Sequence, residues 1–230
     1  MTAQQFREGR RTRGWTQLAA AARLGVSQPY LSQLESGSRP VPQPLARKAV
    51  RLYRLRPTAL PVELGPVRAG DTATELVRQL AALGYPGFTH RRGARPANPS
   101  AVLLAALHCD DLDVRITEAL PWLLLSYPDM DWPLVVRTAK LNNWQNRLGF
   151  LVALALQVAR SRPEWLQSAQ LLAPVAQDLE RARLAAEDTL CQASLPVAER
   201  RWLAQNRSDL ARHWNLLTGL MPEHLSYATP

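Results

Sequence analysis

Residues 15–37 read WTQLAAAARLGVSQPYLSQLESG, and this stretch predicts two short helices joined by a tight turn. The hydroxyl of Thr16 can accept hydrogen bonds from free backbone N–H groups and so begin a helix over 17–24. Gly25 supplies the left-handed backbone conformation that a tight turn needs. A serine two residues later caps a second helix over 28–35.

The spacing of apolar residues in this stretch predicts which face of the second helix is buried. Ala21 is small enough to let the two helices approach at their crossing point. Val26, Leu31 and Leu34 recur at helical spacing and are expected in the core. The outer face and leading end of the second helix then carry Gln28, Pro29, Ser32 and Gln33.

The flanking sequence extends this unit and gives it a strong positive charge. Further helices are expected over 3–13, with Phe6 in the core, and over 43–55. Residues 1–56 carry eleven Arg and Lys against two Glu, whereas the rest of the chain carries 17 basic and 17 acidic residues. A compact cationic unit joined to a neutral one predicts a polyanionic partner for the first unit alone.

In this region the chain resembles the Cro/lambda-repressor-like helix-turn-helix family. The resemblance covers residues 3–56 and implies four or five short helices that bind palindromic operators in double-stranded DNA as a homodimer. Two positions depart from the family pattern, because Ala20 stands where Leu is common and Leu18 where a polar residue is usual. The matching residues are Thr16-Gln17, Ala21, Leu24-Gly25-Val26-Ser27, Tyr30-Leu31-Ser32 and Leu34-Glu35-Ser36-Gly37.

The resemblance implies roles for three polar residues. Gln17, at the start of the first helix of the motif, matches the family glutamine that holds the DNA backbone, where its amide and the helix N-terminus can donate to a phosphate. Arg10 and Glu35 match the family's structural ion pair between the first helix and the end of the third.

Side-chain chemistry extends the candidate DNA-binding set. Gln28 and Gln33 can pair with adenine through both amide groups, and Ser32 can donate or accept at a base edge. Pro29 or Tyr30 can touch a thymine methyl group or the sugar backbone. The set is completed by Ser27, at the leading end of the same helix, and by three candidate phosphate ligands, Arg11, Arg13 and Arg39.

Beyond the cationic unit the chain predicts a linker and a larger helical domain. Proline and glycine are concentrated in 57–70, which is the best domain boundary in the sequence. Over 71–230 helical patterns recur and alternating strand patterns are scarce, so the fold class is all-α. The expected domains are therefore 1–56 for DNA binding, 57–70 as a linker, and 71–230 for dimerisation or partner binding.

No residue pattern in the chain predicts catalysis or a cofactor. His108 precedes acidic residues at 110, 111 and 113, but helix capping accounts for those acids more simply than a metal site does. Cys109 and Cys191 lack metal-site spacing, and we expect both to be buried small apolar residues. The chain begins without a signal-peptide pattern, and its most apolar run, 148–158, is too short to span a bilayer. We therefore expect a cytoplasmic, nucleoid-associated protein that is not an enzyme.

Two regulatory designs fit the C-terminal domain. Its overall character resembles antitoxin-type regulators, in which this domain would bind a co-encoded toxin while the N-terminal module represses their shared operon. Trp122, Trp132 and Trp144 are the candidate partner-binding residues, because tryptophan is common in protein interfaces. The alternative is a stand-alone ligand-responsive or phage-type repressor without a toxin partner. A DNA- or RNA-modifying enzyme is disfavoured by the lack of a catalytic set.

Overall fold

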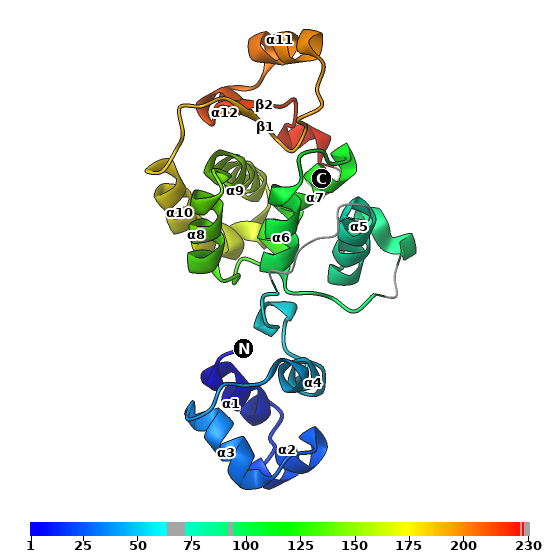
Figure 1. Ribbon diagram of the computed structural model, residues 1–230, viewed down its shortest axis with the longest axis vertical. Coiled ribbons are helices and arrows are strands. Elements are labelled where there is room, and N and C mark those ends of the chain that lie inside the picture. Colours follow the sequence, from blue (N-terminus) through cyan, green and yellow to red (C-terminus); the bar gives the residue numbers. More distant parts are fainter. Residues whose placement is uncertain (64–71, 92–93, 226, 228–230) are drawn as a thin grey trace. The chain divides into compact units, whose positions relative to one another are not determined.

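The computed structural model describes residues 1–63, 72–91, 94–225 and 227 (Figure 1). The chain divides into two units, Met1–Glu63 and Leu64–Pro230. Almost all regular structure in the described residues is helical, as the all-α prediction expected. The first unit contains α1 (Ala3–Thr12), α2 (Gln17–Leu24), α3 (Gln28–Ser36), α4 (Gln43–Tyr53) and the short 3₁₀ helix η1 (Pro57–Ala59).

Local signals in the sequence set the ends of α2 and α3. Thr16 Oγ1 accepts a hydrogen bond from the backbone N–H of Ala19 at 3.1 Å, and Ser27 Oγ accepts from Tyr30 at 3.3 Å. Gly25 ends α2 with φ of +74°, a conformation that a side chain would strain. The two helices therefore begin and end where the sequence predicts.

The core of the first unit is small and closed by α1 and α4. Phe6, Leu31 and Leu34 have no exposed surface, and the ring of Tyr53 packs edge-on against Phe6 with centroids 5.7 Å apart. Ala20 is also fully buried, so the alanine that departs from the family pattern lies in this core. Burial of these apolar side chains fixes α3 against α1 and leaves its opposite face to solvent.

The second unit is built around one buried helix, α9 (Gln145–Arg160). Helices α7 (Val114–Ser126), α8 (Trp132–Leu141) and α10 (Leu166–Glu180) pack against it (Figure 1). The remaining elements are α5 (Thr72–Leu83), η2 (Pro86–Arg91), α6 (Pro99–His108), η3 (Pro163–Trp165), β1 (Asp188–Thr189), α11 (Val197–Asn206), α12 (Asp209–His213), β2 (Leu216–Leu217) and η4 (Pro222–His224).

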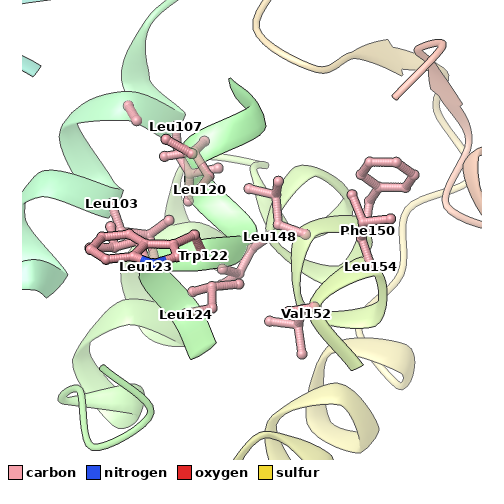
Figure 2. Close-up of a cluster of buried hydrophobic side chains, with 14 of the residues drawn as sticks. Leu103, Leu107, Leu120, Trp122, Leu123, Leu124, Leu148, Phe150, Val152 and Leu154 are labelled. Atoms are coloured by element: carbon pink, nitrogen blue, oxygen red, sulfur yellow. The ribbon is translucent and has the colours of Figure 1, made fainter. Parts of the chain in front are cut away.

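Twelve of the sixteen residues of α9 are buried, because apolar side chains lie on all sides of this helix. Leu148 and Val152 share the core with leucines of α6 and α7, while Phe150 points away from α7 (Figure 2). Gly149 lets the ring of Trp214 lie directly on the α9 backbone. The side chains drawn in Figure 2 include Leu103, Leu107, Leu120, Trp122, Leu123, Leu124 and Leu154.

Two helices expected from the sequence are shorter in the structure. The pattern over 163–190 predicts one long helix, but α10 ends at Glu180, and β1 pairs in parallel with β2 in the register Asp188 to Leu216. The pattern over 208–218 likewise predicts one helix, but α12 ends at His213, because Asn215 has φ of +51° and β2 follows it.

Buried polar groups account for this break. The side-chain amide of Asn146 accepts a hydrogen bond from the N–H of Leu184 and donates to its carbonyl, both at 2.9 Å. Arg147, which is 8% exposed, donates to Asp188 through Nε at 2.7 Å and to the Leu107 carbonyl at 3.0 Å. These long-range partners satisfy the backbone after α10 and hold it extended, although no glycine or proline marks the site.

The described part of the expected linker belongs to the first unit. Residues 57–63 contain η1, in which Ala59 is buried, and Glu63 forms an ion pair with Arg47 of α4. The other expected linker residues, 64–70, lie outside the described residues.

The two cysteines lie in the second unit. Cys191 is fully buried, and burial raises the pKa of its thiol to about 12. Cys109 is half-buried and donates to the carbonyl of Ala105. Among the described helices, none is long and apolar enough to cross a membrane.

Candidate nucleic-acid interface

A buried ion pair joins α1 to the end of α3. Arg10 Nε donates to Glu35 Oε1 at 2.6 Å, and Arg10 Nη2 donates to Glu35 Oε2 at 2.9 Å. The side chains of Arg10 and Glu35 are 11% and 2% exposed. A third donor of the same guanidinium, Nη1, binds the carbonyl of Trp15 at 2.7 Å. One arginine therefore fixes the C-terminal end of α3 and the segment that leads into α2.

The same carboxylate orients two glutamines at the leading ends of α2 and α3. Gln17 Nε2 donates to Glu35 Oε2 at 3.0 Å, and Gln28 Nε2 donates to Gln17 Oε1 at 2.7 Å. The resulting chain runs from α1 through the end of α3 and the start of α2 to the start of α3. It holds the two amides in one defined orientation before any ligand arrives.

The charge of Glu35 is maintained although its side chain is buried. Burial by itself would raise the pKa of this carboxyl, but the hydrogen bonds from Arg10 and Gln17 outweigh it, and the pKa lies below the usual value. The carboxylate is therefore ionised at neutral pH, and both of its oxygens accept hydrogen bonds from residues of the same domain. It does not present free negative charge at the surface, which suits a unit whose expected partner is an anion.

At two predicted positions on the outer face of α3 the side chains are not engaged in internal hydrogen bonds. Gln33 is exposed and Ser32 is half-buried, and neither side chain makes a hydrogen bond within the described residues. Pro29 is exposed beside them, and Gln28 retains its carbonyl oxygen and one N–H for an external partner. This face combines one polar side chain held in place, Gln28, with two that are unengaged, Ser32 and Gln33.

The predicted phosphate ligands differ in their surroundings. Arg11 and Arg39 are exposed, and the Arg39 guanidinium lies 5.8 Å from the ring centroid of Tyr30 on α3. Arg13 is half-buried and its Nε donates to the carbonyl of Leu52 at 3.4 Å. Arg11 and Arg39 are thus exposed to an approaching anion, while Arg13 also contacts the end of α4.

Comparison with protein families identifies this unit. Residues 3–61 match a family model described as "Helix-turn-helix domain". These residues form a helix-turn-helix domain. Comparisons with curated proteins and with solved structures give no match. The helix-turn-helix domain indicates a DNA-binding regulator.

Three further cations of the helix-turn-helix domain were missed by sequence reasoning. Arg7 Nη2 donates to the carbonyl of Glu35 at 2.6 Å, and Lys48 Nζ donates to the carbonyl of Leu24 at 2.7 Å. Both place positive charge at a helix C-terminus, where the helix dipole favours it. The guanidinium of Arg23 lies 4.4 Å from the ring centroid of Trp15. For Arg7 a signal exists, because it lies one turn before Arg10 on the same helix face.

The three tryptophans predicted to bind a partner are not equally accessible. Trp122 is 9% exposed, and its ring packs edge-on against Tyr85 and Tyr127, so it is a core residue. Trp132 and Trp144 are half-buried; Trp132 Nε1 donates to the carbonyl of Pro128 at 2.8 Å. The expectation of an interface is therefore wrong for Trp122, because neighbouring helices already cover its ring.

The acidic residues near His108 have structural partners. Asp113 caps α7 by accepting from the N–H of Arg115 at 2.8 Å, and Asp111 accepts from the backbone and the hydroxyl of Ser194. Throughout the described ranges, no group of three His, Cys, Asp or Glu side chains is placed to hold a metal ion.

Proposed function

We propose that this chain is a sequence-specific DNA-binding transcriptional repressor that lays α3 in the major groove. The hydrogen-bonded chain of Arg10, Glu35, Gln17 and Gln28 is the observation that supports this proposal. It orders the leading ends of α2 and α3 in advance, so that binding to DNA does not cost the rotamer freedom of the Gln17 and Gln28 side chains.

Each side chain of the interface has a role in this docking. Gln17 and the N-terminus of α2 hold a phosphate, which sets the register of the domain on the duplex. Gln28, Ser32 and Gln33 read base edges, and Pro29 or Tyr30 contacts a thymine methyl group or a sugar. Ser27 is the N-cap residue of the same helix. Phosphates are also held by Arg11, Arg13 and Arg39.

Gln33→Ala is the cleanest test of base readout, because Gln33 makes no internal hydrogen bond. After an operator is selected from randomised DNA, the variant is expected to lose about 1–3 kcal/mol of binding free energy on that operator. The loss should disappear when the base pair read by Gln33 is changed. Binding is measured by fluorescence anisotropy over a salt series on operator and random duplexes.

Arg11→Ala is the matched control. It should weaken binding equally on all duplexes and reduce the salt slope by about one. Equal losses on operator and random DNA for Gln33→Ala would contradict the assignment of base readout to α3.

An autoregulating antitoxin is the second candidate for the whole chain. Trp144 supports it, because this indole is half-buried and stacks edge-on with exposed His108 at the surface of the second unit. The buried position of Trp122 removes one residue from the expected toxin-binding set.

Purification from the native cell separates the two designs. For the stand-alone repressor, the nuclease-treated chain is expected to elute without a stoichiometric partner of different sequence. A stoichiometric protein that is toxic when expressed alone would establish the antitoxin instead.

A further inference from the structure

Helix α11 in the second unit is almost unsupported by its own domain. Of its ten residues only Leu203 is buried, while Trp202 is 59% exposed and Val197 is 65% exposed. Isolated helices of this length are marginal in water, and most helices in proteins depend on a packed apolar face. A large aromatic side chain on such a helix is typical of an interface residue.

The same unit has an apolar cleft between α8 and α10. Its volume is about 590 Å³, and its apolar wall includes Trp132, Val136, Leu141, Pro174 and Val175. Leu141 at its edge is 77% exposed. The indole N–H of Trp132 is already used by a backbone carbonyl, so this ring offers an apolar surface to an occupant.

The charges beside the two surfaces are complementary. Lys140 and Asp178 at the cleft neutralise each other at 3.0 Å, but exposed Arg137 has no ion-pair partner within the described ranges. On α11, exposed Glu199 lies one helical turn before Trp202 and has no ion-pair partner within the described residues. The two bases of this helix do not share that position, because Arg200 donates to the carbonyls of Ala193 and Leu195 and Arg201 lies about 100° around the helix from Trp202. The exposed Trp202 ring beside Glu199 on α11 therefore matches the apolar cleft beside Arg137 in both shape and charge.

A single copy cannot join these two surfaces. Figure 1 shows α11 at the edge of the second unit, well separated from α8 and α10. We infer that α11 of one copy docks in the α8–α10 cleft of a second copy, and that the exchange is reciprocal. Such an interface has two-fold symmetry and uses every contact twice. The inference rests on the proposed function, because a palindromic operator requires a two-fold symmetric pair of reading domains.

Trp202→Ala in the full-length chain tests the interface. Sedimentation equilibrium without DNA should show a dimer for the wild type and at least a roughly 100-fold larger dimer dissociation constant for the variant, because an interface tryptophan is lost twice. Val114→Ala is the matched control, since Val114 is 52% exposed on α7 and outside both surfaces. Circular dichroism should show that both variants stay folded.

Charge reversal tests the proposed pairing itself. Glu199→Arg and Arg137→Glu should each weaken the dimer roughly tenfold, and the double variant should restore it. A monomeric wild type, a dimer indifferent to Trp202→Ala, or a double variant no better than the single ones would each overturn the inference. If the cleft instead binds a different protein, the purified wild type should be monomeric.

A DNA-binding assay distinguishes failure of the dimer interface from failure of the proposed function. If the dimer depends on Trp202 but the wild type shows no preference for any operator, the proposed function fails and the interface stands. If operator binding is specific but the dimer ignores Trp202, the interface fails and the proposed function stands.

Discussion

Glu35→Gln is expected to lower the stability of the helix-turn-helix domain by about 3 kcal/mol, because it leaves the buried guanidinium of Arg10 without a counter-charge. A domain of this size buries little surface and has little stability to lose. Hydrogen exchange measured by mass spectrometry on peptides from residues 1–63 should accelerate more than a hundredfold. Peptides from the second unit should be unchanged, and operator binding should fall with the loss of folded domain.

The same substitution should change the response of this domain to acid. The pKa of Glu35 in the folded domain lies below the usual value of about 4.3. Its contribution to stability is therefore complete above that value and is lost as the pH falls through the lower folded pKa. Peptides from residues 1–63 should lose this protection in acid in the wild type, whereas Glu35→Gln should lack it at every pH.

Arg11→Gln is the control for the domain, because Arg11 is exposed on the same helix as Arg10. It should leave hydrogen exchange within a factor of two or so of the wild type, as expected for a surface site. If Glu35→Gln also changed exchange by so little, the ion pair would not be the group that holds α1 to α3.

Gly149→Ala is expected to destabilise the second unit by about 3 kcal/mol, at the upper end of the usual overpacking range. A Cβ atom at this position would lie 2.2 Å from the Trp214 ring, which is 2% exposed and closely surrounded. Because the ring is buried against α9 and belongs to the residue that ends α12, either α9 or the end of α12 must shift. Chemical denaturation followed by circular dichroism should show the lower free energy of unfolding.

Gly219→Ala is the matched glycine control. The nearest atom to an added Cβ there is Leu203 Cδ2 at 3.8 Å, which is ordinary van der Waals contact. Its stability should stay within about 1 kcal/mol of the wild type. Equal stability of the Gly149 and Gly219 variants would contradict the close packing of Trp214 on α9.

The helix-turn-helix segment was predictable because its signals act over a few residues. Thr16, Gly25 and Ser27 determine helix ends through hydrogen bonds and backbone angles within one turn. The apolar spacing of Leu31 and Leu34 then orients α3, since one helix has only one face to bury. Local chemistry alone therefore specified the motif and the residues on its outer face.

The arrangement of the glutamines could not be obtained from the sequence. Gln17, Gln28 and Glu35 are separated along the chain and meet only when α1, α2 and α3 pack around Phe6 and Leu34. The sequence presented Gln17 and Gln28 as independent ligands, whereas packing joins them in one hydrogen-bonded chain. Their shared orientation is a property of the folded core.

In the second unit, the burial of the tryptophans and the end of α10 likewise depended on tertiary packing rather than on local sequence. Residue type alone ranked Trp122 with the interface candidates, yet it is buried, while Trp202 on α11 is exposed. The break after α10 depends on Asn146 and Arg147, which lie more than thirty residues earlier in the chain. The sequence by itself thus determined helix type, helix ends in the first unit and the charge of each part. Burial and long-range pairing came only from tertiary packing. They depend on which distant side chains replace water around each apolar or hydrogen-bonding group, and local sequence does not determine this.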